Sequence, residues 1–77
     1  MANMWREGSI KIGEGIFHYW IKQYTGGSAY GIEGGRISKL MIKRDGEIVC
    51  NYDRSWDVNP VDEDTEFALA ILMKDYN

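Results

Sequence analysis

Two predicted β-strands, joined by a turn that contains two glycines, constrain the fold of this chain most strongly. Residues 8–13 alternate, with Ile10 and Ile12 on one side, and residues 16–25 are dense in aromatic and β-branched residues; both patterns are typical of β-strands. The turn between them is Gly13-Glu14-Gly15, and glycine readily adopts the positive φ that a tight hairpin requires. We therefore expect an antiparallel hairpin in the first part of the chain.

A second hairpin is predicted from residues 36–43 and 47–53, which flank Arg44-Asp45-Gly46. Two loops fit this turn. A two-residue loop pairs the residues that directly flank Asp45-Gly46. A three-residue loop, in which a type I turn is followed by Gly46 in the left-handed region, pairs Lys43 with Glu47.

The length of this loop decides which side chains share a face, because a slip of one residue moves every side chain of a strand to the opposite face. The two-residue loop would give a core of mixed character. The three-residue loop gives one apolar face, and we prefer it for that reason. The residues on that face are Leu40, Ile42, Ile48, Cys50 and Tyr52.

A helix is predicted over residues 62–75, because they open with carboxylates, which favour the positive end of a helix dipole, and continue with strong helix formers. Pro60 lies just upstream, and Asp62 is the expected N-cap. One apolar stripe at helical spacing comprises Ala68, Leu69, Leu72 and Tyr76. Phe67 and Ile71 fall on a second side, so the helix carries more apolar surface than a half-buried helix needs.

Together these elements predict one small α+β domain over residues 1–77. The expected fold is a four-stranded antiparallel β-meander with one C-terminal helix packed on one face, of ββββα type. A chain of 77 residues with 44% hydrophobic content can build one compact core. Cys50 is the only cysteine, so no disulfide can reinforce this core, and a homo-oligomer would compensate for its small size.

The lone thiol and the lack of an apolar run of about eighteen residues favour a cytoplasmic protein over a secreted or membrane-inserted one. Net charge is −3 but is unevenly distributed: residues 1–52 carry seven bases and five acids, whereas residues 53–77 carry two bases and seven acids. This division indicates either a charged surface for a partner or, more commonly, an acidic helix start and a solvated sheet face.

The segment 16–25 presents the most distinctive candidate surface. Its residues alternate, so one side, with Phe17 and Ile21, is expected to lie under the helix. The other side and the neighbouring strand combine aromatic and basic residues: Ile16, His18, Trp20, Lys22, Tyr24, Lys39, Met41 and Lys43. Such a surface can stack single-stranded nucleic acid. We prefer the alternative that Trp20 and Tyr24 fill a core curled on both sides or a protein interface.

No motif for catalysis, a metal ion or a cofactor stands out. The glycine-rich residues 26–35 could cradle a phosphate, but a strand follows them where a phosphate loop requires a helix. Residues 51–57 place a guanidinium between two carboxylates, and we prefer a loop-ordering ion pair anchored by Trp56 to an acid–base pair. A nucleophilic pair of His18 and Cys50 is disfavoured, because Cys50 falls on the face expected to be buried.

The run from Arg36 to Asp57, which ends in Tyr52-Asp53-Arg54-Ser55-Trp56-Asp57, and the acidic helix that ends in Lys-Asp-Tyr-Asn resemble a family of short uncharacterised proteins. That family occurs in Firmicutes, especially gut Clostridia, and in their phages and mobile elements. The likeness covers most of the chain from Trp5 onward, and glycine is usual where this chain has Ser55. The resemblance implies a bacterial or phage cytosol and a role such as modulating a larger host machine, but it transfers no functional residues.

We therefore expect a non-enzymatic interaction module that binds a protein partner, with single-stranded nucleic-acid binding as the alternative. The motivation is the apolar surface on the helix and on residues 16–25 that one small core does not need. No cofactor is expected. The residues expected to form the binding surface are Trp20, Lys22, Tyr24, Lys39, Lys43, Arg54 and Trp56.

Overall fold

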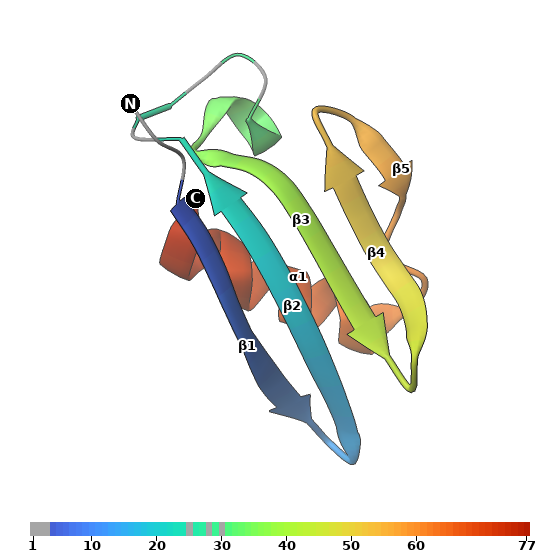
Figure 1. Cartoon of the computed structure of the whole chain (residues 1–77). Coiled ribbons are helices and arrows are strands. Elements are labelled where there is room, and N and C mark those ends of the chain that lie inside the picture. Colours follow the sequence, from blue (N-terminus) through green and yellow to red (C-terminus); the bar gives the residue numbers. More distant parts are fainter. Residues whose placement is uncertain (1–3, 25, 28, 30) are drawn as a thin grey trace.

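A computed structural model describes residues 4–24, 26–27, 29 and 31–77 of the chain (Figure 1). Its strands are β1 (Met4–Ile12), β2 (Gly15–Gln23), β3 (Ile37–Arg44), β4 (Glu47–Asp53) and β5 (Trp56–Val58). A short 3-10 helix, η1 (Ile32–Gly34), lies between β2 and β3, and the helix α1 (Glu63–Tyr76) follows β5. The strands form one antiparallel sheet in the order β1-β2-β3-β4-β5.

The predicted α+β class, with an antiparallel sheet and a C-terminal helix, is confirmed, but the prediction of four strands is wrong because the sheet has five. β5 is only three residues long, too short for an alternating pattern to reveal it, and it joins the sheet by pairing Trp56 with Tyr52. The first strand was expected to start at residue 8 but begins at Met4, because β2 offers it a partner along its whole length. Residue 25, the expected end of the second strand, lies outside the described residues.

The turn between β3 and β4 differs from the preferred three-residue loop. Arg44 pairs with Glu47, so the loop has two residues. Asp45 has a φ of 54° and Gly46 a φ of 79°, and two consecutive residues with positive φ are what a type I′ hairpin turn requires. The primed turn is favoured because its twist matches the right-handed twist of the strands that it joins.

A β-bulge just beyond this turn restores an apolar face despite the shorter loop. The register shifts by one residue in β4, where Val49 is the extra residue. Val49 and the adjacent Cys50 are both buried, with 5% and 0% of their surface exposed. Ile48, expected on the apolar face, is 43% exposed, so that prediction is wrong. The residues of that face whose burial is confirmed are Leu40, Ile42, Cys50 and Tyr52.

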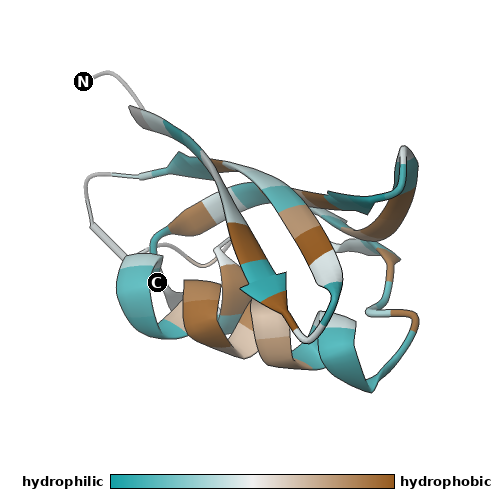
Figure 2. Ribbon diagram, turned by 90° about the horizontal axis from the view of Figure 1, so that it is seen from below, coloured by the Kyte–Doolittle hydropathy of each residue, from teal (hydrophilic) through white to brown (hydrophobic). Residues whose placement is uncertain are grey.

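The helix α1 lies across one face of the sheet, and Figure 2 shows it as a separate layer. Buried apolar residues of the helix and of the strands form one core. From the helix, Ala68 and Leu72 are buried, at 0% and 1% exposure. Each fully buried leucine, isoleucine or phenylalanine stabilises the fold by roughly 1.5–3 kcal/mol. The sheet residues in this core are Phe17, Ile21, Ile37, Leu40, Ile42, Val49, Cys50 and Tyr52.

The start of α1 is fixed by Asp62, which is the N-cap as predicted. Its Oδ1 accepts hydrogen bonds from the backbone N–H of Thr65, at 2.8 Å, and from the Thr65 hydroxyl, at 2.6 Å. Its Oδ2 accepts from Nη2 of Arg44 at 2.7 Å, and the Arg44 guanidinium lies 5.1 Å from the centroid of the Phe17 ring. The β3–β4 hairpin is thereby tied to the first turn of the helix.

The far end of α1 is held by side-chain amides. Nε2 of Gln23 donates to the carbonyl of Tyr76 at 2.7 Å. Oδ1 of Asn77 accepts from the backbone N–H of Ile37 at 3.0 Å, and its Nδ2 donates to the carbonyl of Ile32 at 3.0 Å. These three bonds join α1 to β2, β3 and η1, so both ends of the helix are anchored to the sheet layer.

The glycine-rich segment 26–35 contains η1 in its described part, and positions 28 and 30 lie outside the described residues. Gly35 is required for close packing, because a Cβ atom there would overlap the side-chain amide of Asn77. The backbone at Gly35 therefore lies directly against Asn77 at the end of α1.

Candidate functional site

The sheet face opposite α1 carries aromatic and basic side chains from three strands. On β2, Phe17 and Ile21 are buried toward the helix, so the alternate residues point to the opposite side, as the alternation predicts. We call this surface the lysine–tryptophan face. It comprises Trp5 from β1, Trp20 and Lys22 from β2, and Lys39, Met41 and Lys43 from β3.

Strand pairing places one row of this face across four strands. Lys22 pairs with Trp5 on one side and with Lys39 on the other, and Lys39 pairs with Asp53 of β4. The Lys22 Nζ lies 5.6 Å from the centroid of the Trp5 ring, within the range of a cation–π contact. The Lys39 Nζ lies 3.9 Å from Oδ1 of Asp53, and with 42% and 49% of the two side chains exposed this ion pair is weak.

The next row centres on Trp20, which pairs with Glu7 of β1 and with Met41 of β3. One row further along, Lys43 pairs with His18, but its Nζ leans back to 6.0 Å from the centroid of the Trp20 ring. Both indoles of the face are therefore accompanied by a lysine ammonium, and the flexible Met41 side chain lies in the middle of the face.

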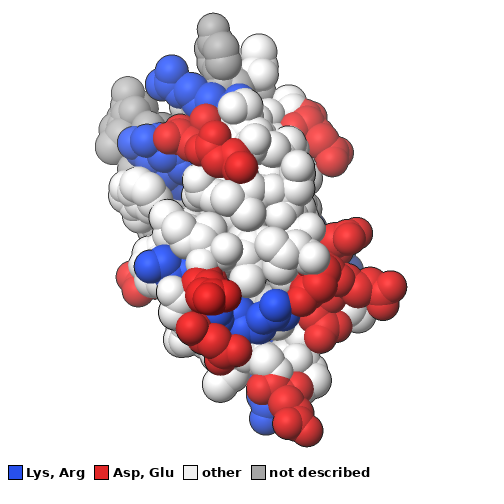
Figure 3. Space-filling view, turned by 90° about the vertical axis from the view of Figure 1, so that its right-hand side faces the viewer, with Lys and Arg blue, Asp and Glu red and all other residues white. Residues whose placement is uncertain are grey.

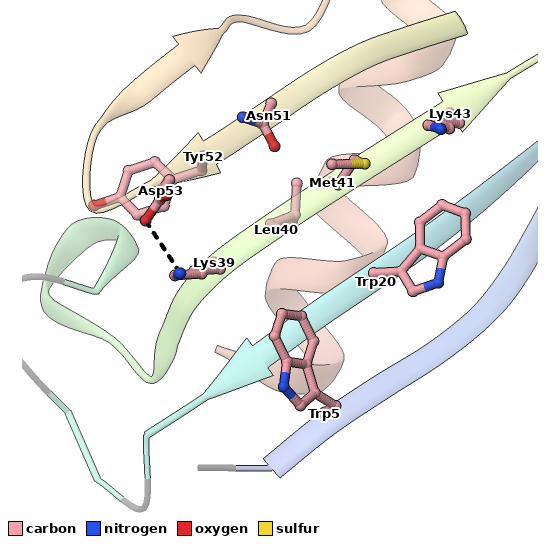
Figure 4. A pocket seen from close by; sticks show the side chains of 9 residues that line it. All are labelled: Trp5, Trp20, Lys39, Leu40, Met41, Lys43, Asn51, Tyr52 and Asp53. Atoms are coloured by element: carbon pink, nitrogen blue, oxygen red, sulfur yellow. Dashed lines mark ion pairs between the residues drawn. The ribbon is translucent and has the colours of Figure 1, made fainter. Parts of the chain in front are cut away.

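The lysine–tryptophan face is hollowed rather than flat, with a cavity of about 450 Å³. Figure 4 shows Trp5 and Trp20 on one side of this hollow and Lys39 reaching toward Asp53 on the other. Trp5 is 59% exposed, so much of its indole is available to a bound molecule. The lining residues are Trp5, Trp20, Lys39, Leu40, Met41, Lys43, Asn51, Tyr52 and Asp53.

The pairing of Lys22 with Lys39 is energetically unusual. Like charges directly opposite each other on adjacent strands are destabilising, whereas opposite charges stabilise by roughly 0.2–1 kcal/mol. The ammonium group of Lys22 lies over Trp5 and that of Lys39 lies beside Asp53, and both contacts oppose this repulsion. An anionic group bound between the two ammonium groups would remove it.

Four of the seven predicted site residues come together on this face: Trp20, Lys22, Lys39 and Lys43. Tyr24 follows the end of β2, where its backbone N–H donates to the carbonyl of Arg36 at 2.7 Å. Arg54 lies in the turn between β4 and β5 with a φ of 65°, so the left-handed residue of this turn is Arg54 and not the adjacent Ser55.

The seventh residue, Trp56, lies in a separate groove on the side of α1. Its ring packs edge-on against Tyr52, with 4.9 Å between the ring centroids. The groove has a volume of about 580 Å³. Its lining residues are Ile32, Glu33, Trp56, Asn59, Pro60, Glu66, Leu69, Ala70 and Met73. Trp56 and Trp20 are therefore not parts of one site.

The candidate catalytic groups do not converge. Cys50 is buried beneath the sheet, and burial raises the pKa of its thiol to about 12, whereas His18 lies on the exposed face. Asp53 approaches Lys39, and Oδ2 of Asp57 accepts from Nδ2 of Asn51 at 3.2 Å. Across the described ranges, no group of three or more histidine, cysteine or acidic side chains could hold a metal ion.

Charge is distributed unevenly between the two sides of the molecule. The first turn of α1 carries Glu63, Asp64 and Glu66. Figure 3, which views the molecule from the side of β5, shows a cluster of acidic side chains at one edge and others mixed with basic side chains elsewhere in the view. The sheet side carries the lysines described above. The lysines of the sheet face and the acidic first turn of the helix thus lie on opposite sides of the sheet, and Glu7 and Asp53 add acidic groups to the lysine side.

Sequence reasoning missed Trp5, because Arg6-Glu7-Gly8 lacks the β-branched residues that mark a strand. One signal could have found it. A long second strand joined to the first by a short turn requires a first strand of similar length, and extending it to residue 4 places Trp5 beside Lys22.

Fold and site together define a small α+β protein in which a five-stranded antiparallel meander carries a helix on one face and an aromatic, basic surface on the other. The chain belongs to the family of the domain of unknown function DUF7678, whose model matches residues 4–77. The predicted membership of an uncharacterised family is thus confirmed. No curated protein and no solved structure matches the chain.

A search for membrane-spanning helices finds none in the part of the chain that the structure describes.

Proposed function

We propose that this protein is a non-enzymatic interaction module whose lysine–tryptophan face binds an acidic, partly apolar segment of a protein partner. The observation that carries the proposal is the direct pairing of Lys22 with Lys39 beside an exposed indole. A carboxylate of the partner between these two ammonium groups replaces repulsion with two attractive contacts. Apolar side chains next to that carboxylate pack into the hollow against Trp5, Trp20 and Met41.

Single-stranded nucleic acid is the second candidate ligand, because two indoles and three lysines on an open sheet are the components of a stacking platform. Three features favour a protein segment. The ammonium groups of Lys22 and Lys43 already lie against the two indoles. The carboxylates of Glu7 and Asp53 point to the same face and repel a chain of phosphates. The protein as a whole carries a net charge of −3.

The setting that we propose follows from the sequence resemblance and from Cys50. A buried, free thiol accords with a reducing cytoplasm. The resemblance to proteins of Firmicutes and of their phages and mobile elements supports a bacterial or phage origin. In that setting the bound segment belongs to a larger host machine that the module modulates.

The proposal is tested by selecting from a random peptide library displayed on yeast, with the full chain as the target. Enriched peptides should combine carboxylates with large apolar side chains. Trp20→Ala should weaken binding of such a peptide about thirtyfold or more, the effect of losing an aromatic anchor. Lys39→Gln should weaken it about two- to fivefold, the value of an exposed charge pair.

Two variants on α1 serve as matched controls. Phe67→Ala removes an aromatic ring that is 63% exposed on the helix, and Lys74→Gln removes an exposed lysine in its last turn. Neither should change the affinity. Peptides that bind both Trp20→Ala and the native chain equally well would contradict the proposal. Tighter, steeply salt-dependent binding of oligo-dT to the same face would replace it with the nucleic-acid function.

A further inference from the structure

The strand β1 forms a long unpaired edge of the sheet. It runs for nine residues without a proline or a register shift, whereas β5, at the other edge, has three residues. In Figure 1 no described strand lies beside β1 on its outer side, where the end of α1 passes behind the sheet. A regular edge of this length exposes a row of N–H and C=O groups that can pair with another strand, and soluble proteins usually protect such edges.

We propose that β1 pairs antiparallel with β1 of a second copy of this chain, centred on Ser9, so that the two sheets become one. The β1–β2 hairpin determines which backbone groups are free for this. Ile12 pairs with Gly15 across a two-residue loop, and in such hairpins the flanking pair exchanges hydrogen bonds. The alternate residues therefore turn their backbone groups outward: Trp5, Glu7, Ser9 and Lys11.

Charge complementarity decides the register. When Ser9 lies opposite Ser9 of the partner subunit, Glu7 lies opposite Lys11 of the partner subunit, and symmetry forms this pair twice. Within the chain the cross-strand neighbours of these residues are apolar, since Glu7 pairs with Trp20 and Lys11 pairs with Ile16. Centring on Glu7 or on Lys11 would instead place like charges directly opposite each other. Centring on Gly8 would form no acid–base pair.

The same register covers apolar surface on the helix side. Ile10 and Ile12 are only partly buried at the edge of the core. Pairing about Ser9 brings Ile12 of the partner subunit beside Arg6, whose Nε donates to Gln23 at 3.2 Å. Gln23 in turn holds the C-terminal end of α1, and Figure 1 shows that end of the helix projecting past β1. The projecting turn would lie over the partner's Ile12.

A charge-exchange series on the full chain tests this register by sedimentation equilibrium. Glu7→Lys and Lys11→Glu should each raise the dissociation constant of the dimer about tenfold, because each replaces two attractive pairs by two repulsive ones. The double variant carrying both changes should return to within about threefold of the native value. Circular dichroism melting of each variant checks that the monomer fold is intact.

Cross-linking tests the geometry independently. Ser9→Cys should form an intermolecular disulfide under mild oxidation, because residues opposite each other on adjacent antiparallel strands lie about 5.5 Å apart at Cα. Ile16→Cys, on the neighbouring strand and 50% exposed in the native chain, is the matched control and should not. The native Cys50 is buried and does not compete. A chain that stays monomeric at every concentration, single charge variants without effect, or equal cross-linking of both cysteine variants would each overturn the proposal.

Discussion

Two apolar residues of α1 should respond in opposite ways to truncation. Leu72 is 1% exposed and packs in the core beneath the sheet, whereas Phe67, one and a half turns earlier, is 63% exposed. The sequence places them on two different apolar sides of the helix, and the structure shows that the side with Leu72 faces the sheet. Replacing each by alanine measures which side of α1 faces the sheet.

The expected sizes follow from burial. Leu72→Ala removes buried methyl groups and leaves a cavity, which costs about 2–5 kcal/mol in well-packed cores. Phe67→Ala removes a ring that is already mostly hydrated, so its cost is below about 1 kcal/mol. A chain of 77 residues has a total unfolding free energy of roughly 4–12 kcal/mol. The leucine variant should therefore lose a large part of its stability, and the phenylalanine variant should stay near the native value.

Urea unfolding followed by circular dichroism at 222 nm gives both numbers. With a slope of about 1 kcal/mol per molar urea for a small protein, Leu72→Ala should lower the midpoint by about 2–5 M, and Phe67→Ala by less than about 1 M. Equal midpoints for the two variants, or a larger loss for Phe67→Ala, would refute the packing of α1 described above.

Three further predictions concern the bulge, the thiol and the helix cap. Val49→Lys should unfold the protein, whereas Ile48→Lys should leave its melting temperature near that of the native chain, because only Val49 points into the core. Burial raises the pKa of the Cys50 thiol to about 12 from an ordinary value of 9.0, so iodoacetamide should label it only after unfolding in urea. On a rising pH scale the thiol ionises in the unfolded chain before it ionises in the folded chain. The contribution of Cys50 to the free energy of unfolding should therefore fall as the pH rises above about 9. Hydrogen bonds from Arg44 and from Thr65 at the start of the helix lower the pKa of Asp62 below its ordinary 3.8. The stabilisation that the Asp62 carboxylate gives to the folded state is therefore present above that pH and is lost as the pH falls below it. In urea titrations at several pH values, Asp62→Asn should abolish that part of the acid sensitivity.

Local patterns in the sequence were sufficient for the main elements of the fold. Alternation in residues 16–25 predicts that Phe17 and Ile21 face the helix, and carboxylates before a run of helix formers locate the N-cap at Asp62. Both signals act within a few residues. Both predictions are confirmed in the structure, because each depends only on residues that are close together in the sequence.

Features that depend on distant pairing were not predictable in this way. The bulge at Val49 reconciles a two-residue turn with an apolar face, and sequence reasoning treated these as alternatives. β5 exists only because the turn at Arg54 brings Trp56 back against Tyr52. The same turn places Trp56 on the side of α1, which separates it from Trp20.

The candidate site was predictable in part. Alternation along one strand placed Trp20 and Lys22 on the same side, and the expected neighbouring strand added Lys39 and Lys43. The pairing of Lys22 with Trp5 depends on the true length of β1, and this length was not visible from composition. The direct pairing of Lys22 with Lys39 follows only from the register between β2 and β3.

Chemical-shift mapping on the nitrogen-15-labelled chain can show whether the lysine–tryptophan face binds a partner segment. A peptide selected on the native protein is titrated in, and every backbone amide and both indole N–H signals of the face are followed. The largest shifts should fall on Trp5, Trp20, Met41 and their neighbours in the hollow. Shifts confined to Phe67 and the outer side of α1, with the indoles of the face unchanged, would contradict the proposed binding surface.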